Sequence, residues 1–166
     1  KLLNLGFPGG PQIEIFAKKG VSLFDLSKPL LKSNDCNFSF SGLKTSVIKI
    51  VESEKNKKKK FKCNICASFQ YAVYKILEAK CRKAFQTFKK KYPNNNNFVV
   101  VGGVASNNFI RKKIRKLAND FKFNLIIPKK ILCTDNAAMI AWTAIEKYKF
   151  VQKDNFYFQP LPQWPI

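Results

Sequence analysis

A chain of 166 residues, of which 46% are hydrophobic, is long enough to bury a sizeable core in one or two domains. No apolar run approaches the roughly 18 residues of a membrane span, and the first residues lack the apolar region of a signal peptide, so we expect a soluble, cytoplasmic protein without a membrane partner. The 31 basic and 10 acidic residues give a net charge of +21, which favours a polyanionic partner such as nucleic acid. Lysine, asparagine, phenylalanine and isoleucine have AT-rich codons, so genome composition is a second source of this charge.

The first part of the chain is predicted to form a helix, a strand and a second helix. The segment Gly6–Pro11 reads "GFPGGP", a turn, and a short amphipathic helix follows it until Gly20. Phe38 and Phe40 alternate with polar residues, which is the pattern of a strand. A helical pattern of apolar residues then starts after Gly42.

A long helix is predicted for the middle of the chain. Lys44 and Thr45 resemble the end of a phosphate loop, but the pattern G-x-x-x-x-G-K-[ST] is missing, so we expect Lys44 to be a solvated residue of a first helical turn. Residues 52–64 read "ESEKNKKKKFKCN", a solvated connector or mobile loop by charge, although its lysines would also suit contact with nucleic acid phosphates. Apolar residues at helical spacing follow as far as Phe88, and Pro93 ends this helix.

Two strand–turn–helix units complete the pattern. Phe98–Val101 is predicted to be a buried strand that leads through Gly102 into a helix. Asn124–Ile127 is predicted to be a second buried strand, followed by a helix whose alanines permit close packing and whose cap is Thr134 or Asp135. Two such units in succession indicate an α/β sheet with helices on its faces.

The turns after these strands are the candidate binding sites. Ligands of open α/β sheets bind beyond the carboxyl ends of the strands, and both "VGGVASNN" and "CTDNAAM" occur there. Helix N-termini attract anions, and glycine allows a ligand to approach the backbone, so Gly102 and Gly103 suit a phosphate or nucleotide. The alternative is structural: the glycines form a tight turn, Asn107 or Asn108 caps one helix, and Asp135 caps the other.

The five cysteines suit a reducing compartment, because they are odd in number and too sparse for a disulfide scaffold. Cys63 and Cys66 have the C-x-x-C spacing of zinc and redox motifs. A zinc site needs two more ligands, but the chain has no histidine and no second C-x-x-C, and a lysine run stands where a redox motif needs a strand. We therefore expect these two residues to be structural.

Five motifs in order carry a resemblance to a known family: "LGFPGGPQIE", "FSFSGLKTSV", "ASFQ", "VVGGVASNNFIR" and "CTDNAAMIA". From Leu2 to about Tyr148 the chain resembles the C-terminal half of the tRNA adenosine threonylcarbamoyltransferase family, of TsaD or Gcp type. The resemblance implies an actin-like, sugar-kinase-like ATPase fold of two α/β lobes. Residues 1–150 would form mainly the second lobe, and 151–166 a peripheral, proline-rich tail. The sequence opens on Lys1 rather than Met, which fits a piece of a longer protein.

The resemblance also implies an activity. The family transfers a threonylcarbamoyl group from threonylcarbamoyl-AMP to the exocyclic amine of the adenosine beside the anticodon, so tRNA, an adenine nucleotide and accessory proteins of the threonylcarbamoylation complex are the expected partners. Glu14 is placed to accept hydrogen bonds from ribose hydroxyls. The residues that the resemblance assigns to the nucleotide are Gly10, Glu14, Gly102, Gly103 and Asn107.

The same resemblance makes Asp135 a ligand of a divalent metal ion, iron or zinc. The family's other ligands are two histidines of an H-x-E-G-H motif in its N-terminal half, and this chain contains no histidine. Milder departures are Ser106 in place of a frequent alanine and Ala137 in place of a frequent glycine. We therefore expect the isolated chain to be inactive as a transferase. The alternative function is a non-catalytic nucleotide-binding or assembly module without the metal.

Overall fold

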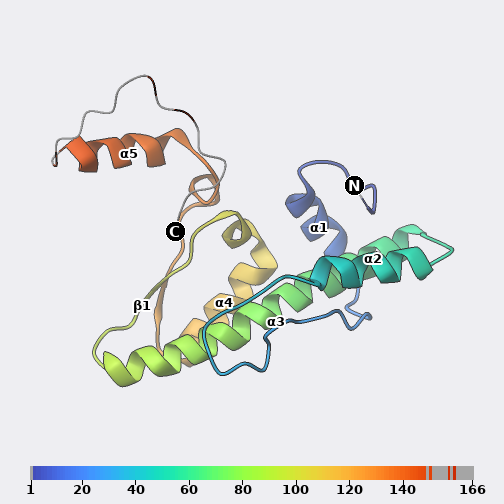
Figure 1. The fold of residues 1–166 in the computed structure, drawn as a ribbon, viewed down its shortest axis with the longest axis horizontal. Coiled ribbons are helices and arrows are strands. Elements are labelled where there is room, and N and C mark those ends of the chain that lie inside the picture. The colour runs from blue at the N-terminus through green and yellow to red at the C-terminus, as the bar shows by residue number, and fades with distance from the viewer. Residues whose placement is uncertain (1, 149, 151–156, 158, 160–166) are drawn as a thin grey trace.

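The computed structural model describes residues 2–148, 150, 157 and 159, so the predicted tail 151–166 lies almost wholly outside the described residues. Its longest element is α3, Lys59–Lys91, against which α1, Gly9–Ala17, and α4, Asn108–Asp120, pack (Figure 1). Among the described helices, none combines the length with the apolar character that crossing a bilayer requires. The helix predicted to end at Pro93 ends at Lys91, and its stop signal is confirmed.

Two apolar clusters hold the other elements against α3. In its N-terminal half, Phe61 and Ile65 pack with residues of α2, Leu43–Ser53, and of the loop that precedes it. In its C-terminal half, Phe85 packs with the buried face of α4 and stacks on the ring of Phe123 at a centroid distance of 4.3 Å. Because each large buried apolar side chain contributes about 1.5–3 kcal/mol, α3 organises both halves of the fold.

The sheet of the described residues has two parallel strands, β1, Asn97–Val99, and β2, Asn124–Ile126. The helix α4 makes the crossover between them, as the two strand–turn–helix units predicted. Side chains alternate along a strand, and the central residues Phe98 and Leu125 point to the cluster around Phe85. The strands are thus attached to the helical layer by one face.

The prediction that these strands are fully buried was wrong. Residues 98–101 and 124–127 were expected to be core, but both strands show exposed first and last residues with a partly buried centre. Val101 is 65% exposed and Ile126 is 45% exposed. The physical reason is that helices cover one face of this sheet and no described element covers the other.

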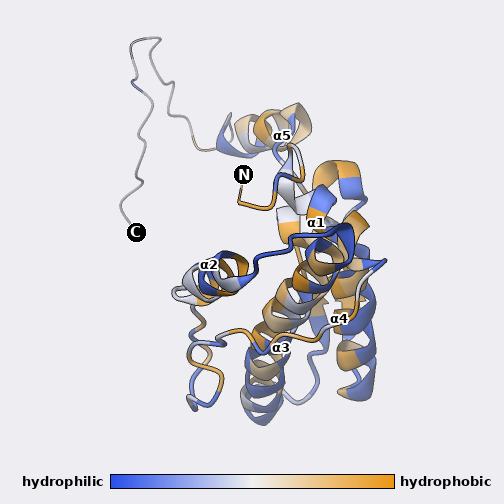
Figure 2. Ribbon diagram, turned by 90° about the vertical axis from the view of Figure 1, so that its right-hand side faces the viewer, coloured by the Kyte–Doolittle hydropathy of each residue, from blue (hydrophilic) through white to orange (hydrophobic). Residues whose placement is uncertain are grey.

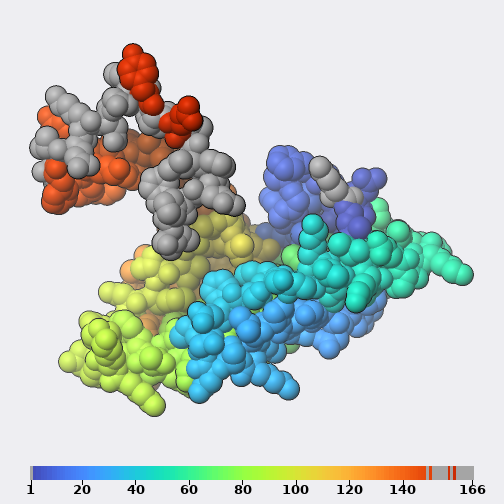
Figure 3. All heavy atoms as spheres, in the orientation of Figure 1, coloured from blue at the N-terminus to red at the C-terminus, as the bar shows by residue number. Residues whose placement is uncertain are grey.

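The predicted strand at Phe38 and Phe40 is also absent. Both lie in the long loop 18–42 between α1 and α2, are exposed, and contact each other edge to edge. A strand needs hydrogen-bonding partners, and no described strand lies beside this segment. The space-filling view in Figure 3 shows part of this loop over the middle of α3, and α2 lies beside the N-terminal half of that helix.

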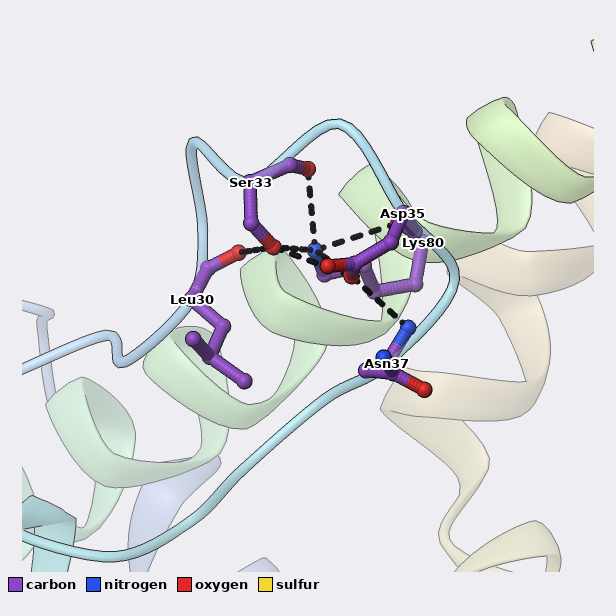
Figure 4. A network of polar contacts seen from close by, with 5 residues as sticks. All are labelled: Leu30, Ser33, Asp35, Asn37 and Lys80. Atoms are coloured by element: carbon purple, nitrogen blue, oxygen red, sulfur yellow. Dashed lines mark hydrogen bonds and ion pairs between the residues drawn. The ribbon is translucent and has the colours of Figure 1, made fainter.

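One buried lysine fixes the loop to the helix. Lys80, on α3, is only 4% exposed, and Figure 4 shows its side chain pointing into the turn formed by Ser33 and Asp35. Its Nζ donates to the Ser33 carbonyl at 3.1 Å, to Ser33 Oγ at 2.6 Å and to the Asp35 carbonyl at 3.3 Å. Hydrogen bonding from Ser33 lowers the pKa of Asp35, which lies 3.4 Å from the same Nζ. The loop that carries Phe40 is thereby anchored.

The last described helix, α5, Ala137–Tyr148, follows the short turn η2, Lys130–Leu132. Its alanines were predicted to permit close packing, but none of its described residues is buried, and Ile140 and Trp142 are among its exposed apolar side chains. Figure 1 shows α5 set apart from α1, α3 and α4, and the colours of Figure 2 show that much of α5 is apolar. Close packing of α5 is therefore not found among the described residues.

Candidate functional site

A pocket of about 640 Å³ lies where α1, the start of α2, α3 and the segment before α4 meet. Most of its wall is apolar, and a few polar groups face it, which is the usual composition of a small-molecule site. The apolar lining includes Ile13, Phe40, Leu43, Phe69, Val73 and Ile110. The polar lining consists of Glu14, Lys44, Gln70, Ser106, Asn107 and Lys130.

Four of the five residues assigned to the nucleotide line this pocket. Gly10 and Glu14 of α1 are distant in sequence from Gly103 and Asn107, which lie in the turn before α4, and the fold brings the two segments together. Gly102 lies beside Gly103 but outside the lining. Their roles as nucleotide contacts stay predictions, but their common location is a property of the structure.

The backbone conformation requires glycine at one of these positions but not at the others. Gly102 has φ of +88°, a left-handed conformation that a residue with a Cβ adopts only with strain. Gly10 has no such constraint, and a Cβ at that position would meet nothing within 4 Å. A Cβ at Gly103 would lie 3.9 Å from Thr134, an ordinary contact. Backbone geometry therefore explains Gly102, while Gly10 leaves space open on the pocket.

The start of α4 is capped by protein groups. A short turn, η1, Gly103–Ser106, separates β1 from α4, and Asn107 is the N-cap whose Oδ1 accepts from the Ile110 N–H at 3.1 Å. Asn107 and Asn108 were the two residues predicted as possible caps of this helix, and Asn107 is confirmed as the cap. The N–H and Nδ2 of Asn108 donate to Glu14 Oε1 at 3.2 Å and 2.6 Å. A carboxylate of the chain therefore occupies the anion position at this helix start.

Glu14 keeps one oxygen for a ligand. Its side chain is 13% exposed, and Lys18 Nζ lies 3.6 Å from Oε1, the oxygen that already accepts from Asn108. Within the described residues, no donor bonds to Oε2. An ionised carboxylate oxygen has two lone pairs, so Oε2 is free to accept from hydroxyl groups of a ligand in the pocket.

Gln70 is the polar residue that sequence reasoning missed. It lies on the buried face of α3, is 7% exposed, and its Oε1 accepts from Asn107 Nδ2 at 2.8 Å. The sequence offered one signal: a glutamine between apolar residues of a predicted helix, inside the motif "ASFQ". Neither spacing nor composition reveals that it meets Asn107.

Two lysines give the pocket a positive rim. Lys44 was expected to be solvated, and it is exposed, but it also lines the pocket together with Lys130. Neither forms an ion pair with a described carboxylate. Glu14 is the single acidic residue of the lining, so the described lining carries a net positive charge and suits an anionic ligand.

Asp135 lies outside the pocket, in the exposed segment before α5. The prediction that Thr134 or Asp135 caps α5 was wrong, because Asn136 Oδ1 accepts from the Met139 N–H at 3.1 Å and the Asn136 amide donates to the Thr134 carbonyl. Asparagine caps as well as aspartate, and Asn136 stands directly before the first helical residue. Asp135 makes no hydrogen bond to a described residue.

Cys63 and Cys66 lie in the first turns of α3, where structural residues were predicted. Cys63 and Cys66 are buried and not joined in a disulfide, and burial raises the pKa of Cys66 to about 11. A thiol with a raised pKa is a poor nucleophile and a poor metal ligand. Among the described residues, no three His, Cys, Asp or Glu side chains lie close enough together to hold a metal ion.

Comparison with known proteins places the chain in a family. The family model described as tRNA N6-adenosine threonylcarbamoyltransferase (TsaD) matches residues 1–142, and the sequence resemblance is thereby confirmed. The chain belongs to this family. It is 45% identical to the tRNA N6-adenosine threonylcarbamoyltransferase of Pelagibacter ubique strain HTCC1062, a match that covers 100% of this chain and 46% of that protein.

Two further relatives carry the same name. The protein of Wolbachia pipientis wMel is 41% identical over 100% of this chain and 49% of its own length. That of Rhodospirillum rubrum is 40% identical over 100% of this chain and 47% of its own length. The chain therefore spans about half the length of the curated relatives that it matches.

Proposed function

We propose that this chain is the nucleotide-binding part of a tRNA-modifying transferase, with the fold of the second lobe of an actin-like ATPase. The complete enzyme would move a threonylcarbamoyl group from threonylcarbamoyl-AMP to the exocyclic amine of the adenosine next to the anticodon. The observation that carries the proposal is the pocket, where Gly10 and Glu14 of one motif meet Gly103 and Asn107 of another.

The chemistry of the pocket supports an adenylate as its ligand. The apolar wall, with Phe40 and Phe69, suits a planar base, because base and wall both lose contact with water. The Oε2 of Glu14 suits two adjacent ribose hydroxyls, which are donors. Lys44 and Lys130 on the rim suit a phosphate. Each part of a nucleotide thus has a group of matching character.

A divalent metal ion, iron or zinc, does not fit the described residues as a complete site. Asp135 is the ligand that we propose, but catalytic sites commonly use about three protein ligands, and no group of three lies together here. The chain also has no histidine. Further ligands would have to come from outside the described residues, and no chemistry follows from Asp135 alone.

We propose tRNA and accessory proteins of threonylcarbamoylation as partners, in the cytoplasm. The net charge of +21 supports a polyanionic partner. The second candidate function is a nucleotide-binding or assembly module without catalysis.

The test separates these functions with one set of samples. Calorimetry should show saturable AMP binding to the chain, which Glu14→Ala weakens. The chain incubated with threonylcarbamoyl-AMP and unmodified tRNA should form no modified nucleoside, whereas adding the complementary N-terminal half of the Pelagibacter ubique relative should restore turnover. Binding without restored turnover would favour the non-catalytic module. The absence of AMP binding would refute the nucleotide site.

A further inference from the structure

We propose that Gln70 reads the bound base, donating a hydrogen bond from its side-chain Nε2 to a ring nitrogen of the adenine. This inference rests on the proposed nucleotide function of the pocket and deepens it. Neither the family assignment nor the sequence motifs give Gln70 a role. It follows from the direction of a short chain of hydrogen bonds that ends at the pocket.

The direction of that chain is set by a backbone group. The N–H of Ile110 can only donate, so the atom of Asn107 that it meets at 3.1 Å must be the acceptor, Oδ1. The other end of the Asn107 amide is then the donor Nδ2, and the Gln70 atom at 2.8 Å must be the acceptor Oε1. What Gln70 has left is its NH₂ group.

This NH₂ group needs an acceptor and has none among the described residues. Gln70 is 7% exposed and lines the pocket, so its Nε2 has little access to solvent except through the pocket. Nε2 is not itself a fully buried atom, so water reaches it in the open pocket, and a ligand acceptor that displaces this water takes over the hydrogen bond. Ser106 Oγ, also on the pocket, is a fully buried polar atom without a described partner.

The surroundings of Gln70 select a base rather than a phosphate. Phe69 and Val73 of α3 and Ile110 of α4 line the pocket together with Gln70. A phosphate in such apolar surroundings would lose its hydration without a cation to replace it. Adenine offers the ring acceptors N1, N3 and N7, each able to accept from an amide. Oε1 already accepts from Asn107, so the NH₂ group is the part of Gln70 without a described partner, and it matches a ring nitrogen rather than the exocyclic amine of the base.

The helix makes this contact specific. Gln70 lies in the N-terminal half of α3, one turn from the buried residues Cys66 and Tyr74, so the carboxamide is held at both its backbone and its oxygen. A donor fixed in this way strengthens the binding of a ligand that has an acceptor at one position. A ligand with C–H at that position binds more weakly. Gln70 is thus a specificity-determining residue of the pocket, with Asn107 as its positioning residue.

The experiment measures, by calorimetry, the binding of AMP and its 1-deaza, 3-deaza and 7-deaza analogues to the intact chain. One analogue should bind about threefold to tenfold more weakly than AMP, the range expected for one neutral hydrogen bond. Gln70→Met should weaken AMP by the same factor and abolish the discrimination against that analogue. The control is Gln86→Met, an exposed position on the same helix, which should leave all four affinities unchanged.

Each other outcome overturns the inference in a distinguishable way. If all three analogues bind the unaltered chain within twofold of AMP, Gln70 reads no ring nitrogen, even if the variant fails to fold. If Gln70→Met binds AMP normally, or keeps the discrimination, the contact belongs to another residue while the nucleotide site stands. If the unaltered chain binds no AMP, the proposed function falls and the inference falls with it.

Discussion

Two neighbouring glycines allow the location of the ligand to be tested against a matched control. Gly9 and Gly10 both lie in the first turn of α1, neither has a left-handed φ, and a Cβ at either meets nothing within 4 Å. They differ in what they face: Gly10 lines the pocket described above, whereas Gly9 lines a second, apolar pocket of about 600 Å³ beside Leu3 and Val47. Replacing each by alanine therefore adds the same methyl group to two different spaces.

The two variants should agree in stability and differ in binding. Alanine restricts the unfolded chain and favours helix, so each should raise the free energy of unfolding by about 0.4–1 kcal/mol, measured by urea denaturation. A methyl group where the ligand touches Gly10 costs about 1–3 kcal/mol, by analogy with overpacking of a core. AMP affinity should therefore fall by roughly fivefold to 150-fold in Gly10→Ala and stay unchanged in Gly9→Ala, as measured by calorimetry.

The reasoning fails if the two variants bind AMP alike, because the ligand then does not reach Gly10. It also fails if Gly9→Ala is the weaker binder, which would move the ligand to the second pocket. A loss of stability in Gly10→Ala, rather than a gain, would mean that the open space beside its Cα is filled by protein.

Three further predictions concern groups outside the pocket. Asp135→Asn should leave amide exchange in the first turn of α5 unchanged, whereas Asn136→Ala should speed it by the loss of about 1 kcal/mol of capping. In the intact enzyme, the metal content of Asp135→Asn tests its proposed role as a ligand. Full metal occupancy in this variant would show that Asp135 is not a ligand. Replacing Lys57–Lys60 by serine should reduce the slope of log tRNA affinity against log salt by about 0.7–0.9 for each lost phosphate contact. An unchanged slope would mean that these lysines form a solvated segment that does not contact tRNA. Because cations at a helix start oppose its dipole, the same change should not destabilise α3. Lys80→Met should lower the free energy of unfolding by about 1–3 kcal/mol, since carbonyls of the loop lose their donor, and the partly exposed Lys83→Met should not.

The helices could be predicted from sequence because their signals are local. Apolar spacing marks the buried face of α3, and Pro93 stops it by removing an N–H and restricting the residue before it. Gly42, with φ of +79°, begins α2 where the pattern changes. Such signals depend on residues within a few positions of one another, so a single chain contains all of them.

The strands depend on contacts that local patterns do not contain. Phe38 and Phe40 alternate as a strand does, but a strand exists only where another backbone pairs with it, and Lys80 holds this loop against a helix instead. Burial at Val101 and Ile126 depends equally on whether another element covers the outer face of the sheet. Alternation fixes which residues share a face, not whether that face is covered.

Only part of the pocket could be predicted from the sequence. The residues alone supported little more than caps and tight turns, and it was the family resemblance that grouped Gly10, Glu14 and Asn107. The contact of Asn107 with Gln70 joins residues 37 positions apart, and no spacing rule links two helices in that way. The polar groups left open for a ligand become visible only when each hydrogen bond within the protein has been assigned.

A substitution at Asn107 can test ligand recognition separately from stability, because its two polar side-chain atoms make different contacts. Oδ1 caps α4, and Nδ2 orients Gln70. Asn107→Asp keeps a capping oxygen, and aspartate caps as well as asparagine, so stability should change by less than about 0.5 kcal/mol. The second carboxylate oxygen cannot donate to Oε1 at 2.8 Å, so the Gln70 amide should rotate, turn its NH₂ group to the new carboxylate and present an acceptor to the pocket. AMP affinity should then fall about threefold to tenfold, as in Gln70→Met, with the discrimination among deaza analogues lost.

Asn119→Asp, at the exposed far end of α4, adds the same charge away from the pocket and should leave both unchanged. If Asn107→Asp binds AMP as the unaltered chain does, then Asn107 serves α4 alone and does not orient Gln70.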